Sequence, residues 1–341
     1  MSNDTKMIVG ISSGDINGIG IEIILKTFED KRMFEFCIPV IYASNKTFSK
    51  HKKQLKINTP IQSINSIHNL IPNKINVISV WKEDVPIAFG EATKTGGKYA
   101  LLSLEEAVKD LNDEKIDVLV TAPINKETIQ SDSFNFPGHT EFLESKIKGE
   151  ALMILMSDDL KVALMTGHIP INKVTEAITP ELIYKKVILL IKTLQQDFSI
   201  SKPKIAVLSI NPHAGDNGVI GEDDQKILIP TIEAIRKEGA LVYGPYPSDS
   251  FFGSGNYKKF DAILASYHDQ GLTPFKTLSF GNGVNFTAGL ERIRTSPDHG
   301  TAFDMAGKGI ADISSFKEAL FTAIEIYNTR KENLELKKNS I

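Results

Sequence analysis

The sequence from residue 7 to residue 20 is MIVGISSGDINGIG, and it indicates the fold class of the chain. The apolar run at residues 7–11 predicts a buried strand, and the glycine-rich turn after it leads into a predicted helix from about residue 20 to residue 28. The same order recurs along the chain, because short β-rich runs alternate with segments of helical periodicity. Such alternation is typical of an α/β architecture with a largely parallel sheet.

Further segments continue this alternation. Predicted strands cover residues 39–42, 117–120, 161–165, 204–210 and 261–267, and predicted helices cover residues 101–111, 182–194, 227–237 and 316–327. The second of these helices opens with Thr179-Pro180-Glu181, a plausible cap with proline in the first turn. No linker or repeat interrupts the pattern, so the pattern alone places no domain boundary. Residues from 331 onward are expected to form a polar tail that frays.

The composition is that of an ordinary globular protein. The chain has 341 residues, 41% of them hydrophobic, and 39 Lys and Arg against 42 Asp and Glu leave a net charge of −3. At this length we expect two lobes instead of one core. The near-neutral charge argues against nucleic acid or an anionic membrane as a partner. The single cysteine, Cys37, excludes a disulfide framework and a multi-cysteine metal site.

No stretch of the sequence has the pattern of a membrane span or a secretory signal. The longest clean aliphatic run, residues 187–191, is far shorter than the roughly 20 residues that span a bilayer. Residues 1–6 carry charge, but no apolar segment of a signal peptide follows them. We therefore expect a cytoplasmic protein without a membrane partner.

The glycine-rich turn at residues 14–20 differs from the two common nucleotide-binding loops. Its spacing is Gly-x-x-x-Gly-x-Gly, whereas the dinucleotide fingerprint is Gly-x-Gly-x-x-Gly. No Gly-Lys-Ser/Thr follows it, so it is not a Walker loop either. A nicotinamide cofactor would therefore bind outside the usual Rossmann scheme.

Three histidines share one local context. His168, His213 and His268 each follow a predicted buried strand within a few residues. Ligands of open α/β sheets bind outside the carboxyl ends of the strands, and neighbouring strands lie only ~5 Å apart. Three imidazoles that converge there would leave coordination positions open on a catalytic divalent metal. The alternative is three unrelated loop histidines, and the spacing alone leaves both interpretations open.

Other polar loops carry candidates for binding an anion. His139 and Thr140 occupy a turn before a helical pattern, where Thr140 could equally be a helix cap. The small-residue loop at residues 211–221 could hold an anion or a nucleotide through its backbone amides. Cationic and polar side chains follow His268 and suit a phosphorylated or carboxylated substrate, although each could also be a solvated surface group: Lys276, Asn285, Arg292 and Arg294.

With these motifs in place, the chain resembles the 4-hydroxythreonine-4-phosphate dehydrogenase family of pyridoxal phosphate biosynthesis. The resemblance covers nearly the whole chain, from about residue 7 to about residue 327, in the family's order. The matching stretches are residues 14–20 (GDINGIG), 120–126 (VTAPINK), 138–141 (GHTE), 211–215 (NPHAG), 267–271 (YHDQG) and 293–302 (IRTSPDHGTA).

The resemblance implies a metal site and a substrate site. The family's metal ligands fall on His168, His213 and His268, with zinc, magnesium or cobalt left open as the metal. Its catalytic acid matches Asp249, and Lys276 is a second catalytic candidate. Its substrate contacts fall on His139, Thr140, Lys276, Asn285 and Arg294. The cofactor is NAD or NADP, and no residue is assigned to binding it.

The resemblance also implies a fold. It is similar to that of isocitrate and isopropylmalate dehydrogenases, with two α/β lobes, an active site in the cleft between them, and a homodimer that shares the site. We expect residues 1–125 and 290–335 to form the first lobe, residues 126–289 to form the second lobe with the metal ligands, and residues 336–341 to form a tail.

The activity that the resemblance implies is oxidation of 4-phosphooxy-L-threonine at C3, followed by decarboxylation to 3-amino-2-oxopropyl phosphate. A dehydrogenase of threonate or erythronate 4-phosphate is the alternative within the same chemistry. A metal-dependent lyase or hydrolase without redox chemistry, and a non-enzymatic binding protein, are less favoured.

The sequence departs from the family pattern at a few positions. Ile16 and Ile21 stand where the family's opening loop usually carries proline, which we expect to alter the stiffness of the loop and not its function. Pro274 lies one position later than expected, while the distance from His268 to Lys276 is preserved.

Overall fold

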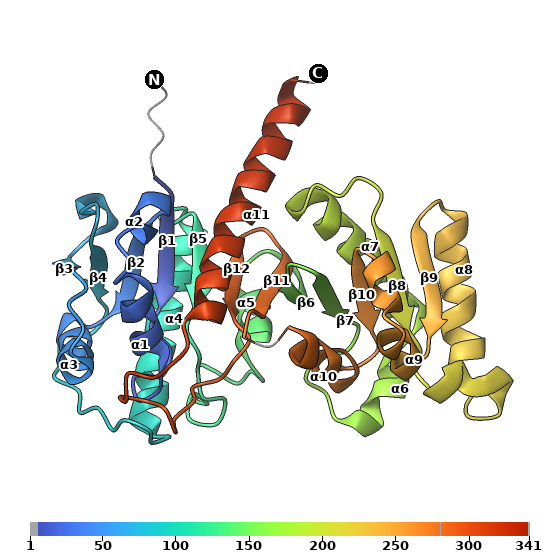
Figure 1. Cartoon of the computed structure of the whole chain (residues 1–341), viewed down its shortest axis with the longest axis horizontal. Coiled ribbons are helices and arrows are strands. Elements are labelled where there is room, and N and C mark those ends of the chain that lie inside the picture. Colours follow the sequence, from blue (N-terminus) through green and yellow to red (C-terminus); the bar gives the residue numbers. More distant parts are fainter. Residues whose placement is uncertain (1–5, 280, 340–341) are drawn as a thin grey trace. The chain divides into compact units, whose positions relative to one another are not determined.

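The computed structural model describes residues 6–279 and 281–339, and these residues pack into two compact units. The first unit contains residues 6–149 and 290–327, and the second contains the described residues of 150–289 together with residues 328–339. Both units combine strands with helices (Figure 1), which confirms the predicted α/β class.

The first unit is built on parallel strands. The order of its strands is β3-β4-β2-β1-β5-β12, and each neighbouring pair is parallel. Val9 and Ile11 of the central strand are fully buried, as expected of a strand covered on both faces. The strand bounds are β1 (Ile8–Ser12), β2 (Ile38–Ala43), β3 (Ile61–Ile64), β4 (Ile75–Ser79), β5 (Val118–Thr121) and β12 (Arg294–Pro297).

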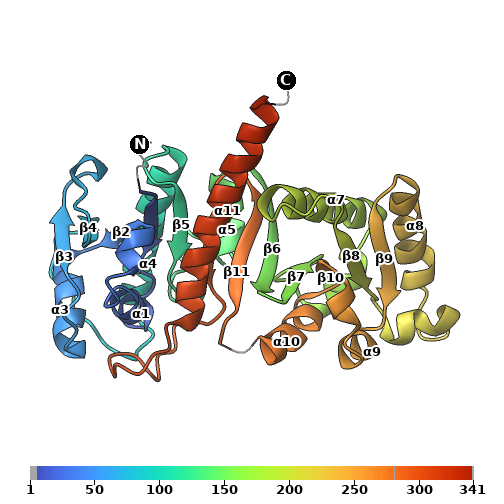
Figure 2. The ribbon, with the colours of Figure 1, turned by 45° about the horizontal axis from the view of Figure 1, so that its top comes forward.

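Helices pack beside these strands (Figures 1 and 2), and the longest that lies wholly in this unit contacts β1, β2 and β5. That helix, α4 (Lys94–Asn112), begins at Thr93, whose hydroxyl accepts the Gly96 amide at 3.0 Å and so satisfies an amide of the first turn. The other helices are α1 (Gly20–Thr27), α2 (Met33–Phe36), α3 (Asn45–Leu55) and α5 (His139–Lys146), with a 3₁₀ turn at Ile67–Asn69.

The second unit has a mixed strand arrangement, in the order β11-β6-β7-β10-β8-β9. β6 and β7 form an antiparallel hairpin, whereas β7, β10, β8 and β9 pair in parallel. The strand bounds are β6 (Gly149–Ser157), β7 (Leu160–Leu164), β8 (Lys204–Leu208), β9 (Leu241–Tyr246), β10 (Ala262–Ala265) and β11 (Val284–Leu290).

A single buried cluster joins β7, β8 and β10 of this unit. Val162, Ala206 and Ile263 lie in it, and Phe251 and Phe275 of two helices pack over them. These strands are almost continuously apolar, which is the composition that parallel strands covered on both faces require. Their rigid ends are the places where the sequence predicts histidines.

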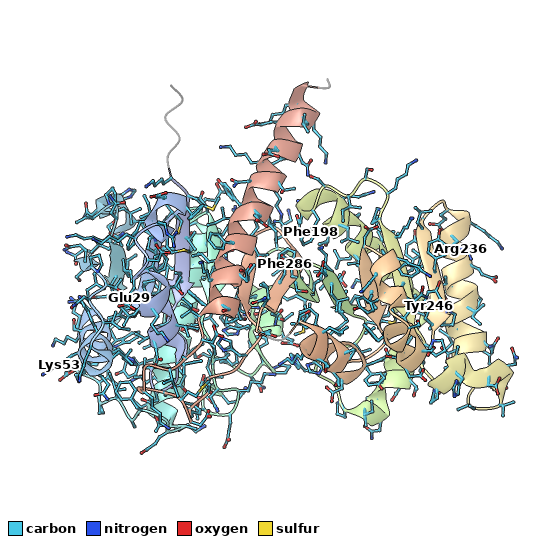
Figure 3. All side chains as sticks on the ribbon, in the orientation of Figure 1. Glu29, Lys53, Phe198, Arg236, Tyr246 and Phe286 are labelled. Carbon is cyan, nitrogen blue, oxygen red and sulfur yellow. The ribbon has the colours of Figure 1, made fainter. Side chains whose placement is uncertain are left out.

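Helices of the second unit cover its strands. α8 lies along β9 in both views, with the Arg236 guanidinium 5.3 Å above the Tyr243 ring, and Phe198 packs edge-on against Phe286 at a centroid distance of 6.2 Å (Figures 1 to 3). The predicted cap of α7 is confirmed, because Thr179 accepts the Leu182 amide. The bounds are α6 (Val174–Ala177), α7 (Pro180–Asp197), α8 (Ile229–Lys237), α9 (Ser248–Gly253) and α10 (His268–Leu278). Shorter turns are 3₁₀ segments at Ile171–Lys173, Pro212–Gly218 and Asn256–Lys259, and a π-helical turn at Asp224–Leu228.

The boundary between the units differs from the one that we expected at residues 125 and 126. Residues 126–149 belong to the first unit, and their contacts with α4 explain why. A Cβ atom on Gly97 would lie 2.0 Å from the Thr128 carbonyl oxygen, so only glycine allows the two segments to approach. The Asn112 side chain also donates to the Lys146 carbonyl at 2.9 Å.

The last helix, α11 (Ser314–Asn339), is longer than predicted. Its residues from 328 onward belong to the second unit, where Arg330 makes two hydrogen bonds of 2.6 and 3.0 Å with the buried Asp197. The expected tail at residues 336–341 is helical up to residue 339, and residues 340 and 341 lie outside the described part.

Among the residues that the structure describes, no helix combines the length and the apolar character needed to cross a membrane.

Candidate functional site

Two of the three predicted metal ligands lie side by side in the second unit. His168 and His268 have ring centroids 5.3 Å apart. The neighbouring strands β7 and β10 continue to bond beyond their ends, because the Met165 amide donates to Ala265 and the Thr166 hydroxyl donates to the Ser266 carbonyl at 2.7 Å. The parallel pairing therefore delivers both imidazoles to one edge of the sheet, as the sequence predicted for this pair.

The His268 ring is oriented by a neighbouring carboxylate. Its Nδ1 atom lies 2.7 Å from Asp269 Oδ1, and a carboxylate can only accept, so Nδ1 carries the proton. In the neutral ring, Nε2 then presents its lone pair. A carboxylate bonded to the far nitrogen is the usual arrangement behind a metal-ligating histidine.

Gln270 ties the ends of β10 and β8 together next to His268. Its side chain accepts the Ser266 amide at 2.7 Å and donates to the Ser209 carbonyl at 2.6 Å, and it is buried. Ser266 follows β10 and Ser209 follows β8, so one amide group joins the strand that leads to His268 with the strand that leads to His213. Gln270 lies in the motif at residues 267–271, but no local pattern in the sequence indicates this role.

His213 lies in the turn after β8 and is exposed. Within the described residues there is no group of three or more His, Cys, Asp or Glu side chains placed to hold a metal ion. The structure therefore brings His168 and His268 together without assembling all three predicted ligands. The donor chemistry of the pair fits a borderline divalent ion, because two imidazoles lie 5.3 Å apart and one of them is backed by a carboxylate.

The remaining predicted residues of the second unit lie on three different elements. Asp249 is exposed in the first turn of α9, and Lys276 is exposed on α10, two turns beyond His268. Asn285 lies on β11, and its buried Oδ1 atom has no hydrogen-bond partner among the described residues. A buried acceptor without a partner is costly, which is consistent with a bound group at this position.

The first unit holds a buried guanidinium. Arg294 of β12 is only 1% exposed, and its Nε and Nη2 atoms donate to the Thr121 hydroxyl at 3.0 and 2.5 Å. Thr121 ends the neighbouring parallel strand β5, so strand pairing sets this contact. Burial lowers the pKa of Arg294 to about 9, and the Glu141 carboxylate acts in the opposite direction.

His139 lies in the electrostatic field of this arginine. Burial of the ring, together with the positive charges of Arg294 and Lys126, holds the pKa of His139 well below its ordinary value, so the ring is neutral at neutral pH. Its Nε2 atom is buried and has no partner among the described residues. A buried cation beside an imidazole with an open nitrogen is suited to an anionic group of a substrate.

Thr140 is not the helix cap that the sequence allowed. α5 begins at His139, its N-cap is Gly138, and no side chain caps the helix. The surroundings of Arg294 and His139 also include Thr121, Lys126 and Glu141, which were not predicted as site residues. All three lie inside the quoted motifs, but only the fold shows which side chains surround Arg294.

The glycine-rich turn at residues 14–20 is a buried structural junction. Asn17 accepts the Ala88 amide and donates to Thr93, the N-cap of α4, with both distances 2.9 Å. Asp15 is fully buried beneath the same helix end, and burial raises its pKa. Ile16 stands at one of the positions where we expected proline; its side chain is buried and its carbonyl bonds to His51 Nε2 at 2.9 Å.

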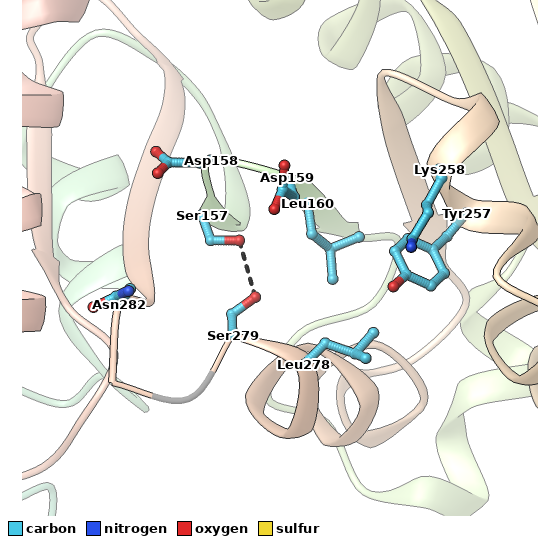
Figure 4. Close-up of a pocket in the computed structure, with 9 residues that line it drawn as sticks. All are labelled: Ser157, Asp158, Asp159, Leu160, Tyr257, Lys258, Leu278, Ser279 and Asn282. Carbon is cyan, nitrogen blue, oxygen red and sulfur yellow. Dashed lines mark hydrogen bonds between the residues drawn. The ribbon is translucent and has the colours of Figure 1, made fainter.

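A cavity of about 510 Å³ opens in the second unit away from the predicted residues (Figure 4). The β6–β7 turn supplies Asp158 and Asp159, and the end of α10 supplies Leu278 and Ser279. The Ser157 and Ser279 hydroxyls bond across one side at 2.9 Å. None of the predicted site residues lines this cavity.

Comparisons with known proteins agree with these motifs. Residues 35–323 match the family model described as pyridoxal phosphate biosynthetic protein PdxA. The chain is 46% identical over 340 residues to a 4-hydroxythreonine-4-phosphate dehydrogenase of Bacteroides thetaiotaomicron, covering 99% of this chain and 93% of the relative. It is 37% identical to a D-threonate 4-phosphate dehydrogenase of Cupriavidus necator, covering 96% and 99%.

Solved structures show the same fold. The crystal structure of a 4-hydroxythreonine-4-phosphate dehydrogenase from Klebsiella pneumoniae superposes with a TM-score of 0.81 at 31% identity, covering 96% of this chain and 99% of the other. An isocitrate dehydrogenase from Methylococcus capsulatus matches with a TM-score of 0.50 at 10% identity, covering 97% and 89%. The second likeness concerns the fold alone, and it agrees with the fold that the sequence led us to expect.

Proposed function

Because the chain belongs to the PdxA family of pyridoxal phosphate biosynthetic proteins, we propose that it is a dehydrogenase of 4-phosphooxy-L-threonine. The reaction is oxidation at C3 followed by loss of the carboxylate as CO₂, which gives 3-amino-2-oxopropyl phosphate. The observation that carries this proposal is the pairing of His168 and His268 at the carboxyl ends of adjacent parallel strands.

In this proposal His168, His213 and His268 hold a divalent metal, which is zinc, cobalt or magnesium. When bound, the metal would supply Lewis acidity at the C3 oxygen, and NAD or NADP would supply the hydride acceptor. Asp269 holds the His268 ring in the ligating tautomer. Asp249 accepts the proton of the C3 hydroxyl, and Lys276 returns a proton to the carbon that loses CO₂.

The anionic groups of the substrate are bound by Arg294, His139, Thr140 and Asn285. Burial lowers the pKa of Arg294 to about 9, against the opposing effect of Glu141, so the guanidinium stays charged at neutral pH, and Thr121 fixes its direction. His139 contributes a neutral ring, so it adds no second positive charge. We further propose that the enzyme acts as a homodimer that shares its site.

The test is a coupled assay on the purified full-length protein with 4-phosphooxy-L-threonine, NAD or NADP, and a divalent metal. We expect reduced nicotinamide to form, and we expect a chelator to abolish turnover and added metal to restore it. Turnover that survives complete metal removal would overturn the metal site, and the absence of any reduced nicotinamide would overturn the dehydrogenase.

The alternative substrate is a four-carbon sugar-acid 4-phosphate, such as threonate 4-phosphate. The 37% identity to the Cupriavidus necator enzyme supports it. The two substrates differ by an amine in place of a hydroxyl, so kcat/KM measured for both under the same conditions decides between them.

A further inference from the structure

The backbone around His213 has an unusual conformation. Five consecutive residues, from His213 to Asn217, have positive φ angles of 52°, 53°, 78°, 42° and 55°. Four of the five are not glycine, and a left-handed turn is unfavourable for such residues, because Cβ crowds the following carbonyl oxygen. A run of this kind persists only when its surroundings hold it in place.

One buried carboxylate supplies much of that support. Asp224 is fully buried and accepts the Ile210 and Asn211 amides at 2.8 and 2.9 Å. It also accepts Asn211 Nδ2 at 3.0 Å. These bonds fix the chain immediately before the left-handed turn, where β8 has ended.

The far side of the turn packs against the same group of residues. The Ile220 amide donates to the Gly215 carbonyl at 3.0 Å, which closes the turn. A Cβ atom on Gly221 would lie 2.8 Å from the Asn211 side chain, and one on Gly215 would lie 2.5 Å from the Gly221 carbonyl oxygen. The chain therefore folds back tightly on Asn211, and the Asn211 side chain is in turn hydrogen-bonded to Asp224.

Asp224 itself begins a π-helical turn, Asp224–Leu228, which precedes α8. π-turns are rare and recur at functional sites, where the extra residue re-aims a side chain. Here the turn places an acidic side chain inward beneath the loop, whereas its neighbour Glu222 forms an exposed ion pair with Lys226.

We propose that Asp224 is a positioning residue for His213: its carboxylate clamps residues 210 and 211 and so holds the left-handed turn that presents the imidazole. The inference rests on the proposed function in one respect, namely that His213 is a metal ligand. The clamp itself is a property of the turn and can be measured without metal.

The test compares Asp224→Asn with Asp261→Asn in the full-length, metal-free protein. Asp261 is the matched control, because its carboxylate accepts the Lys204 amide at 2.7 Å at the opposite end of the same strand. The measurements are hydrogen exchange of the amides of residues 210–220, Co²⁺ affinity by calorimetry, and the thermal midpoint.

For Asp224→Asn we expect hydrogen exchange of the amides of residues 210–220 to become about tenfold faster or more. We also expect the Co²⁺ dissociation constant to rise about tenfold, which is the usual effect of removing a group that supports a metal ligand. Asp261→Asn should lower the thermal midpoint while leaving both other readouts unchanged. Wild-type exchange at the turn in Asp224→Asn would overturn the clamp. Faster exchange with unchanged Co²⁺ affinity would overturn the positioning role.

A second variant covers the case in which Asp224→Asn does not fold. Glycine favours positive φ, so Ala214→Gly should slow exchange in the Asp224→Asn background and restore folding and Co²⁺ binding in part. The absence of any rescue would overturn the role of the strained turn. His213→Ala separates the failure of the metal-ligand assignment from the failure of the clamp. Unchanged Co²⁺ affinity in that variant overturns the assignment of His213 as a ligand, whereas the hydrogen-exchange data alone decide whether Asp224 clamps the turn.

Discussion

Two imidazoles of the first unit lie in a different environment from the paired imidazoles of the second unit. In the first unit, His51 is fully buried, and burial lowers its pKa to about 4. His139 is also held neutral, beside the buried Arg294. In the second unit, His168 is half-buried and the His268 side chain is 33% exposed at the strand ends. Desolvation thus keeps His51 and His139 neutral, whereas the rings of His168 and His268 are partly accessible to an incoming ligand.

This difference assigns different kinds of work to the two units. A desolvated cation such as Arg294 binds an anion strongly, because water no longer competes for it. A metal, in contrast, must reach its ligands from solution and needs open coordination positions. The comparison predicts that substitutions at His168 and His268 act on metal binding and turnover, whereas a substitution at Arg294 acts on substrate affinity and one at His51 acts on stability.

The largest effect is expected for His168→Ala. Loss of one of the paired imidazoles should lower kcat by about 10³-fold, the scale of removing one group that stabilises developing charge. Bound metal, measured by atomic emission, should fall with it. His68→Ala is the control, since that histidine is exposed in a 3₁₀ turn. A variant with normal metal content and normal turnover would contradict the assignment.

Arg294→Lys should act mainly on substrate affinity. Lysine keeps the charge but lacks the fork that contacts Thr121, so we expect KM to rise by about 10- to 100-fold while metal content stays normal. The matched control is Arg292→Lys, two residues away on the same segment, where the side chain bonds to Glu114. Equal KM values for the two variants would show that the buried arginine does not bind substrate.

Asp269→Asn should produce a smaller change in the second unit. Without the carboxylate, the His268 tautomer is no longer fixed, and metal affinity should fall by about tenfold. Calorimetric titration with Co²⁺ measures this directly. Asp30→Asn, at an exposed aspartate paired with Arg32, serves as the control. An unchanged dissociation constant would refute the orienting role.

The last predicted effect concerns folding stability and its pH dependence in the first unit, and leaves turnover at neutral pH unaffected. His51 has a folded-state pKa of about 4, so below pH 6.5 the unfolded chain binds a proton that the folded chain does not. The contribution of the neutral His51 ring to folding stability is complete above the pKa of the unfolded chain and is lost as the pH falls toward the folded-state pKa. Between pH 7 and pH 5, the wild type should lose about 2 kcal/mol more stability than His51→Gln, measured by denaturant unfolding. Parallel losses in the two proteins would contradict this linkage.

The alternation of strands and helices was predictable because it depends on local periodicity. The strands that end near His168 and His268 were found because each is short, apolar and followed by polar residues. The strands that were missed are β3, β4, β6, β9, β11 and β12. β3 (IQSI) mixes polar with apolar residues and is partly exposed, whereas β6 was missed although residues 151–156 form a continuous apolar run. The extension of α11 was missed as well, since its last turns are polar.

The candidate site was predictable at the level of residue types and not at the level of surroundings. The histidine after each strand is visible in the sequence, and so is Arg294. Three features of the site depend on contacts between segments that are distant in the sequence. They are the hydrogen bond of Arg294 to the Thr121 hydroxyl, the bonds of the Gln270 amide to two strand ends, and the support of the His213 turn by the Asp224 carboxylate. No local pattern encodes such contacts.

What the sequence by itself determined is the alternating α/β pattern and the kinds of side chain that follow each strand, because both depend on periods of two and 3.6 residues along the chain. What only the tertiary structure decided is which of those side chains become buried, charged or strained. Burial and backbone strain arise from packing between segments far apart in the sequence, and this is why Arg294 lies desolvated against Thr121 while His213 lies on a left-handed turn.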